Sequence, residues 1–165
     1  MQVRHSTEHD LPAICDIFEH ARQYMREHGN LNQWVDGYPS KDIILEDIKL
    51  NRSYVLVDEN HQIIATMMYE IADDPTYEVI KGAWLNDEPT GVIHRIATKT
   101  NQKGVASFMI DWALNQCPNL KIDTHQDNVP MLRLLRKHNF TQCGIIFLTS
   151  GEPRIAFQKT RRREP

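Results

Sequence analysis

Cysteine is scarce in this sequence. The three cysteines, Cys15, Cys117 and Cys143, are odd in number, widely spaced and without a CxxC pair. A disulfide framework needs an even set and a cysteine-based zinc site needs close spacing, so the sequence favours neither. We interpret the three as small buried thiols of a protein in a reducing compartment.

Long apolar runs are also absent. No stretch approaches the roughly 20 apolar residues that a membrane-spanning helix needs, and the N-terminus lacks the basic-then-apolar pattern of a signal peptide. We therefore expect no membrane partner and a cytoplasmic location.

An excess of positive charge is missing as well. Lys and Arg number 19 against 22 Asp and Glu, a net charge of −3, whereas nucleic-acid-binding proteins usually carry a basic face. The sequence thus predicts no nucleic-acid partner. What is present, 41% apolar and 25% charged residues, is typical of a soluble globular protein. We expect one domain over residues 1–160 and a solvated basic tail over residues 161–165.

A strand that runs through a small-residue turn into a helix is the most informative segment. Gly91–Thr98 is apolar and predicts the strand, and Ser107–Leu114 predicts the helix. The first N–H groups of a helix have no partner inside it and carry partial positive charge, so such a turn can bind an anion. Gly104 would let a phosphate approach the backbone, and Lys103 would add a charge. The turn has neither GxxxxGK(S/T) nor GxGxxG, and a glycine that serves packing alone is the competing interpretation.

Two motifs in order then point to a family. The first is the turn itself, Asn101-Gln102-Lys103-Gly104-Val105-Ala106, and the second lies in a helix that Asn128 caps and that Asn139 ends in a left-handed conformation. The second motif reads Asn128-Val129-Pro130-Met131-Leu132-Arg133-Leu134-Leu135-Arg136-Lys137-His138-Asn139-Phe140. The chain resembles the GNAT superfamily of N-acetyltransferases, which move an acetyl group from acetyl-coenzyme A (acetyl-CoA) to an amine. Their motifs read Arg/Gln-x-x-Gly-x-Gly/Ala and Asn-x-x-Ala-x-x-Leu-Tyr-x-Lys-x-Gly-Phe.

The remaining segments fit one α+β module. Periodicity alone predicts a mixed α/β protein, and the resemblance implies a single-domain GNAT-like fold with a central mixed, mostly antiparallel sheet flanked by helices. The expected strands are 2–5, 53–58, 62–70, 91–98, 120–125, 144–149 and 154–159, and the expected helices are 10–27, 40–50, 107–114 and 129–137. Between them, 73–89 is loop-like, with a short apolar piece at Val79-Ile80.

The resemblance also implies a donor site. In relatives the strand before the phosphate turn binds the pantetheine arm through its backbone and diverges from the next strand, and the turn holds the pyrophosphate. Carried over, the coenzyme-binding residues would be Ile96, Ala97, Thr98, Asn101, Gln102, Lys103, Gly104, Val105, Ala106, Ser107 and Asn128. The turn is about two residues shorter than usual, and Asn101 stands where relatives have Arg or Gln.

Catalysis needs a base to take a proton from the amine. In a regular strand His94, Ile96 and Thr98 share a face, which would place His94 beside the coenzyme, while Arg95 would point away and form a salt bridge. Relatives have a histidine or glutamate at a similar position, and a hydrogen-bonded structural histidine is the alternative. Glu70, at the end of a strand, and Asp123 and His125, on one face of the next strand, are further candidates. The spacing of the polar residues 123–128 matches no metal signature, so we expect no metal.

Leu135 is the clearest departure from the family. Many relatives have a tyrosine there that protonates the departing thiolate; Tyr69, Tyr77 and Cys143 could replace it. The departure favours a second interpretation, a non-catalytic acyl-CoA-binding module or sensor. A homodimeric interaction domain with a vestigial cleft is a third, since relatives often dimerise.

The acceptor is expected to be a small cationic amine. In relatives the first two helices, the loop between them and the loop before the phosphate strand form the acceptor groove. Here these loops contain aromatic and acidic residues, which suit a cation unless they are merely solvated. They are Trp34, Tyr38, Asp73, Asp74, Trp84, Asp87 and Glu88. No cysteine is well placed as a nucleophile, so we expect direct transfer.

Overall fold

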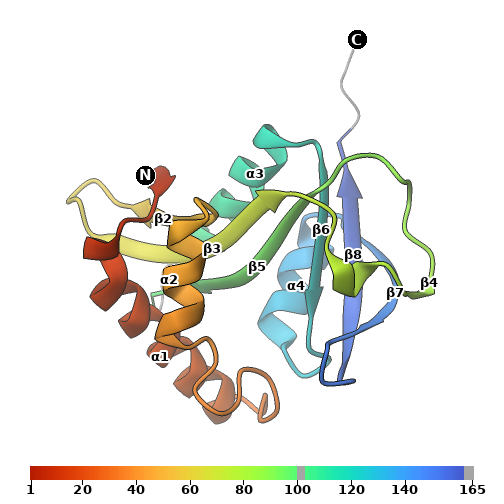
Figure 1. The fold of residues 1–165 in the computed structure, drawn as a ribbon, viewed down its shortest axis with the longest axis horizontal. Helices are drawn as coiled ribbons and strands as arrows, with labels where there is room; N and C mark the ends of the chain where they lie inside the picture. Colours follow the sequence, from red (N-terminus) through yellow and green to blue (C-terminus); the bar gives the residue numbers. More distant parts are fainter. Residues whose placement is uncertain (100–102, 162–165) are drawn as a thin grey trace. The chain divides into compact units, whose positions relative to one another are not determined.

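The computed structural model describes residues 1–99 and 103–161. Eight strands form one mixed sheet in the order β1-β2-β3-β5-β6-β8-β7-β4, with helices packed on it (Figure 1). β5 and β6 pair in parallel from Gly91 to Ile93, and the pairs β1–β2, β2–β3, β6–β8, β7–β8 and β4–β7 are antiparallel. The expected fold class, an α/β chain with a mixed and mostly antiparallel sheet, is confirmed.

The chain folds as two compact units. Unit 1 comprises Met1–Tyr69 and His94–Trp112, and unit 2 comprises Glu70–Ile93 and the chain from Ala113 onward. Strands β3 and β5 and helix α3 each continue from one unit into the other along the chain. We describe each unit by itself.

Unit 1 contains a core between two helices and one face of its strands. The core side chains are Ile14, Ile17 and Phe18 of α1, Ile44 and Ile48 of α2, Val55 of β2 and Ala97 of β5. Their spacing along the helices is the one that puts apolar residues on a single face. The elements are β1 (Gln2–His5), α1 (Leu11–Glu27), α2 (Lys41–Lys49), β2 (Ser53–Val57), β3 (Ile63–Ile71), β5 (Gly91–Thr98) and α3 (Val105–Gln116), with the 3-10 turn η1 (Glu8–Asp10) before α1.

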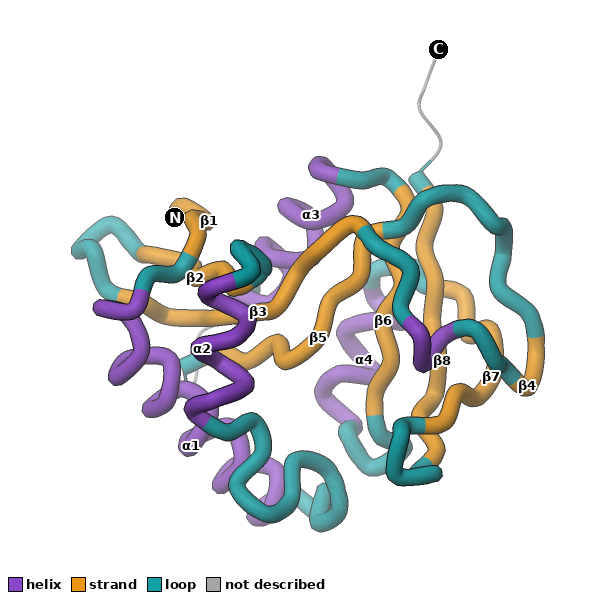
Figure 2. The backbone as a smooth tube through the Cα atoms, viewed as in Figure 1, coloured by secondary structure: helices purple, strands orange, loops and turns teal. Residues whose placement is uncertain are grey.

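Local signals define the ends of the first two helices. Ser40 accepts a hydrogen bond from the Ile43 N–H at 3.3 Å and caps α2 as expected, and Gly29, with φ of +81°, follows the end of α1. The long loop between the two helices is visible in Figure 2. On the opposite face of the strands the ring of Trp112 in α3 packs against Tyr54 and Tyr69, with centroids 4.9 and 5.5 Å apart. The strands of unit 1 thus have α1 and α2 on one face and α3 on the other.

Unit 2 is built on an antiparallel group of strands. Its elements are η2 (Pro75–Tyr77), β4 (Lys81–Gly82), β6 (Asn119–Thr124), α4 (Val129–Lys137), β7 (Thr141–Phe147) and β8 (Pro153–Thr160). Tyr77, Val92, Ile146 and Ala156 form a buried cluster on one face. Strands β7 and β8 form the predicted closing hairpin, although β7 spans Thr141–Phe147 rather than the expected 144–149. Helix α4 has the predicted limits.

Local differences from the prediction concern one short strand and the limits of two elements. The segment 73–89, predicted to be loop-like, contains the strand Lys81–Gly82 directly after the apolar piece Val79-Ile80, of which Val79 is 73% exposed. This strand pairs with β7 where Gly82 and Gly144 come so close that a Cβ on either would lie 2.1 Å from a carbonyl oxygen. Helix α3 begins at Val105, two residues earlier than expected, and β6 ends at Thr124.

Two further predictions concern the tail and the thiols. The Arg161 N–H donates to the Pro118 carbonyl at 2.7 Å and its guanidinium to Asn115, so a solvated tail does not begin at Arg161; residues 162–165 lie outside the described part. All three cysteines are free, Cys117 buried and the other two half-buried. Within the described residues, no helix is both long and apolar enough for a membrane span.

Candidate functional site

The strand-turn-helix segment of unit 1 has the geometry that the sequence predicted. Gly104 is left-handed, with φ of +80°, and its carbonyl accepts a hydrogen bond from the Phe108 N–H at 3.0 Å in the first turn of α3. The opening N–H groups of a helix generally lack a carbonyl of the same helix, which makes this end of α3 a place where an anion can bind. Asn101 and Gln102, two of the expected phosphate ligands, lie outside the described residues.

This helix end can hold an anion. The partial positive charge of the helix N-terminus and the exposed Lys103 act at the same place, and a Cβ built on Gly104 would meet no atom within 4 Å. Gly104 is required here for its positive φ, which residues with a side chain adopt at a steric cost.

Strand β5 leads into this turn. Ile96 and Thr98 are half-buried, whereas Ala97 is 6% exposed and packs in the core of unit 1 with α1 and α2. A ligand could reach Ala97 through its backbone alone. The Lys99 N–H donates to the Ile64 carbonyl at 2.7 Å, which ties the end of β5 to β3.

Arg95 interrupts β5. Its φ is +52°, in the left-handed region, and its Nε and Nη2 donate to the two carboxylate oxygens of Asp47 at 2.8 Å each. The predicted salt bridge of Arg95 is confirmed. The regular alternation that put His94, Ile96 and Thr98 on one face does not hold through a left-handed residue, so spacing alone does not establish that shared face. His94 itself is half-buried and directly precedes this residue.

Asp47 is a residue that the sequence reasoning missed. It lies on the buried face of α2 between Ile44 and Ile48, is 4% exposed, and also accepts from Arg52 Nε at 2.9 Å. Arg95 additionally donates from Nη1 to the Tyr38 hydroxyl at 3.0 Å. Burial lowers the pKa of Arg95, but Tyr38 and Asp47 outweigh it, and the pKa lies above its ordinary value. An acidic residue on the apolar face of a helix was the available signal, because such a charge needs a buried partner.

Unit 2 contains the remaining candidate carboxylates. Tyr77 is 4% exposed and its hydroxyl donates to Asp123 Oδ2 at 2.6 Å. Burial and then the negative charge of Asp123 raise the pKa of Tyr77 well above its ordinary value. Tyr77 therefore stays protonated and holds one oxygen of Asp123 in place. Glu70 is half-buried in β3.

His125 lies in the turn after β6, not on the strand face that was predicted. The strand ends at Thr124, and His125 Nδ1 accepts a hydrogen bond from the Asp127 N–H at 3.0 Å. Burial and then the charge of Arg154 lower the pKa of His125. Because Nδ1 accepts this hydrogen bond, the neutral ring carries its proton on Nε2. The Asp127 carboxylate lies 3.7 Å from Nδ1, but a neutral imidazole forms no ion pair with it.

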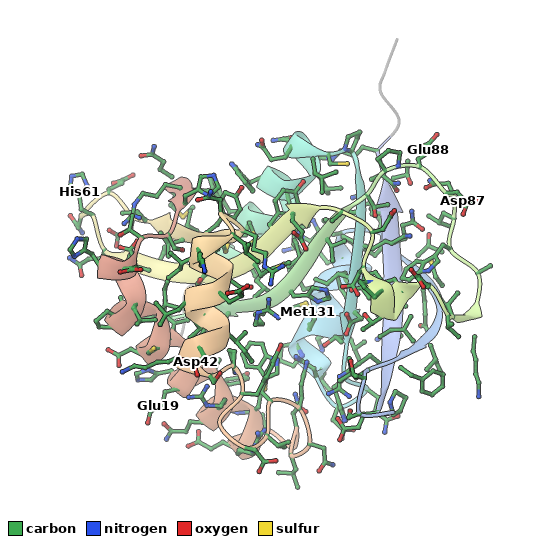
Figure 3. The ribbon with its side chains drawn as sticks, viewed as in Figure 1. Glu19, Asp42, His61, Asp87, Glu88 and Met131 are labelled. Carbon is green, nitrogen blue, oxygen red and sulfur yellow. The ribbon has the colours of Figure 1, made fainter. Side chains whose placement is uncertain are left out.

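Asn128 caps α4 as predicted. Its Oδ1 accepts from the Met131 N–H at 3.2 Å, and Asn139, with φ of +58°, follows the end of the helix. Figure 3 labels Met131 on this helix. The Oδ1 atom of Asn128 thus serves the cap of α4.

Known proteins resemble this chain in both sequence and fold. A model of the acetyltransferase (GNAT) family matches residues 12–140. This chain belongs to the GNAT acetyltransferase family. A GNAT acetyltransferase from Streptococcus agalactiae is similar over 98% of this chain and 96% of its own, with 27% identity and a TM-score of 0.89. No curated protein matches the chain.

More distant GNAT structures share the fold. A ribosomal-protein-alanine N-acetyltransferase from Brucella melitensis has 17% identity and a TM-score of 0.64, over 98% of this chain and all (100%) of its own. A phosphinothricin acetyltransferase from Sinorhizobium meliloti, solved with acetyl-CoA, has 14% identity and a TM-score of 0.63, over 96% and 87%. Membership of the family implies an acyltransferase, and the donor in this family is acetyl-CoA.

The position of the GNAT tyrosine is part of the core here. Leu135 is fully buried in α4, and its hydrocarbon side chain has no acidic proton to give to a leaving thiolate. Of its predicted substitutes, Tyr69 is 4% exposed and packs against Trp112, and the Tyr77 hydroxyl is held by Asp123. Burial raises the pKa of the Cys143 thiol, so the thiol stays protonated and is a weaker acid than an exposed cysteine.

The expected acceptor residues have structural partners. Lys121 Nζ lies 4.5 Å from the centre of the Trp84 ring, so a cation of the protein already occupies one face of that ring. Trp34 packs edge-on against Phe18 at 5.5 Å, and Asp74 accepts from the Thr76 N–H in η2. Asp87 and Glu88 are exposed in the loop between β4 and β5 (Figure 3).

In residues 1–99 and 103–161, no three His, Cys, Asp or Glu side chains gather as a metal site would require.

Proposed function

We propose that this GNAT protein is an acetyl-CoA-dependent N-acetyltransferase that acetylates the primary amine of a small molecule by direct transfer. The observation that carries the proposal is the β5 strand that leads through the left-handed Gly104 into the N-terminus of α3. In a member of this family, that segment is suited to hold the phosphates of the donor.

The donor would lie along unit 1. The pantetheine arm would follow the backbone of Ile96, Ala97 and Thr98, and the pyrophosphate would meet the N–H groups that open α3, with Lys103 close by. A helix N-terminus stabilises a bound anion through several N–H groups and the helix dipole together.

His94 is our proposed base. The His94 imidazole takes one proton from the acceptor ammonium, and the neutral nitrogen then attacks the thioester carbonyl carbon. The carbon–sulfur bond breaks to release the coenzyme thiolate, and the second proton of the nitrogen passes to solvent. An imidazole can accept a proton near neutral pH, whereas His125 has its Nδ1 engaged and its pKa lowered. Asp123, oriented by Tyr77, and Glu70 are the next candidates.

The leaving thiolate can depart without an acid. A thiol has a pKa of about 8.5, so its thiolate is a moderately good leaving group even though Leu135 replaces the family tyrosine. Direct transfer is supported by the raised pKa of Cys143, the thiol considered for a covalent step.

A small cationic amine is the proposed acceptor. Support comes from the exposed carboxylates Asp73, Asp87 and Glu88, which are free to face solvent in the segment between β3 and β5. The relatives whose names state an acceptor class include one that acts on a ribosomal protein, which makes a peptide N-terminus the natural comparison. A homodimer and a cytoplasmic location remain predictions from the sequence.

The second candidate function is a non-catalytic acyl-CoA-binding module. The buried leucine at position 135, where many relatives have the catalytic tyrosine, favours it. It requires the same donor site and differs in the absence of transfer.

Release of coenzyme thiol separates these functions. We expect acetyl-CoA to yield free thiol in the presence of one or more small amines, above the rate without amine, and mass spectrometry to find the acetylated amine. A peptide panel with free N-termini is the matched acceptor set. Binding of acetyl-CoA with no amine-dependent thiol release would favour the binding module, and turnover of peptides alone would contradict the small-molecule acceptor.

A further inference from the structure

A left-handed residue with a large side chain stands inside a strand of unit 1. Arg95 has φ of +52° in the middle of β5, where every residue would ordinarily be extended. Residues other than glycine adopt this conformation at a steric cost, and it persists only where the surroundings hold it.

The surroundings hold Arg95 through its side chain. Its guanidinium forms two parallel hydrogen bonds with Asp47, both 2.8 Å, and a third with the Tyr38 hydroxyl at 3.0 Å. The Asp47 side chain is 6% exposed and that of Arg95 is 12% exposed, so the pair is largely shielded from water. Two parallel hydrogen bonds between a guanidinium and a carboxylate fix the orientation of the arginine side chain as well as its distance from the carboxylate.

Asp47 is itself firmly placed. It lies on α2 next to Ile48 and three residues after Ile44, both in the core of unit 1, and Arg52 donates to it from the other side. The carboxylate is therefore anchored to the core rather than carried on a mobile surface side chain.

The residues next to Arg95 in β5 are held in place as well. Ala97 is buried in the same core, so β5 is held at positions 95 and 97, and Ile96 lies between two fixed points. His94 immediately precedes the first of them. Small displacements of a reacting group cost much rate, since a shift of about 1 Å can lower it by about a hundredfold.

We propose that Arg95 and Asp47 are a positioning pair, which holds β5 in its left-handed conformation and thereby places His94 and Ile96 for acetyl transfer. This inference rests on the proposed function. Neither side chain needs to touch the substrate, because the pair acts through the backbone of β5.

Two substitutions at one position test the pair. Arg95→Ala removes the side chain and leaves a residue that resists positive φ, whereas Arg95→Gly removes it and leaves one that adopts positive φ without steric cost. We expect Arg95→Ala to lower kcat by about a hundredfold with a smaller change in the KM for acetyl-CoA, and Arg95→Gly to recover most of that loss. Asp47→Asn, which weakens the two hydrogen bonds with Arg95, should resemble Arg95→Ala.

Arg52→Ala is the matched control. It removes a second arginine from the same carboxylate but keeps the Arg95 side chain and its own two hydrogen-bond partners on Asp47, so it should reduce thermal stability while changing kcat far less than Arg95→Ala. Equal kcat in Arg95→Ala and Arg95→Gly would overturn the inference, as would losses of kcat that parallel the losses of stability in all variants. A wild-type protein without amine-dependent turnover would instead overturn the proposed function, and with it the catalytic role of the pair.

Discussion

At the scale of single residues, the two candidate histidines differ in what their rings can do. His125 closes the turn after β6 with its Nδ1, while His94 lies on β5 next to the segment proposed to hold the donor. The two histidines therefore differ in location: His125 lies in a turn of unit 2, and His94 lies on the strand that leads to Gly104 in unit 1.

Replacing His94 tests the proposed base. His94→Ala should lower kcat at neutral pH by about a hundredfold or more, because general bases typically contribute that much, and should leave the Kd for acetyl-CoA nearly unchanged. Steady-state kinetics with the best amine and a separate binding titration give the two numbers. If kcat is unaffected, the base is elsewhere, and Asp123 and Glu70 are the variants to make next.

His125 should make stability depend on pH. Because its pKa is lowered in the folded protein, the unfolded chain takes up a proton as the pH falls through the ordinary value, and the folded chain resists it. The free energy of unfolding should therefore fall below about pH 6.5. His125→Asn keeps an oxygen that can accept from the Asp127 N–H but does not titrate, so it should lose less stability on acidification.

Denaturant unfolding at about pH 7.5 and about pH 5.5 measures this difference, since the histidine contribution changes between those values. The same loss in the wild type and in His125→Asn would show that other groups carry the pH dependence.

At the scale of elements, the strand-turn-helix segment depends on one backbone conformation. Gly104 has φ of +80° with no atom near its missing Cβ, so a larger residue there is strained rather than clashing. The same description fits Gly151, with φ of +88°, in the turn between β7 and β8. A residue with a side chain would therefore be strained to a similar degree at position 104 and at position 151.

Gly104→Val should weaken acetyl-CoA binding. The valine would impose strain of about 1–2 kcal/mol and put a side chain where the phosphates are proposed to lie. Gly151→Val should lower thermal stability comparably without changing the Kd for acetyl-CoA. Calorimetric titration of both variants makes the comparison, and equal affinity in Gly104→Val and the wild type would contradict the phosphate assignment.

At the scale of the whole molecule, donor binding should stabilise the fold. A ligand at about a hundred times its Kd stabilises by about 2.7 kcal/mol, which raises the melting temperature of a chain this size by about 5–11 °C. We expect this shift with acetyl-CoA and a much smaller one with S-acetylpantetheine, which lacks the phosphates. Equal shifts with both ligands would place the binding energy away from the N-terminus of α3.

Much of the fold was predictable because its signals are local. Helix α4 has the limits predicted from Asn128 and Asn139, and Ser40 caps α2. β4 was missed because its two residues pair with β7 across about sixty positions, and a two-residue strand has no pattern of its own. Of the candidate site, the turn at Gly104 was predicted, but the placing of His125 required knowing where β6 ends.

By itself, the sequence determined the family, the order of most elements and the strand-turn-helix segment before α3, because glycine, capping residues and apolar periodicity act over a few neighbouring residues. Tertiary structure alone decided that Arg95 is left-handed, that Asp47 holds its side chain, and that Tyr77 holds Asp123. The two pairs join residues 48 and 46 positions apart, and they form because a buried charged or polar group needs a partner that replaces water.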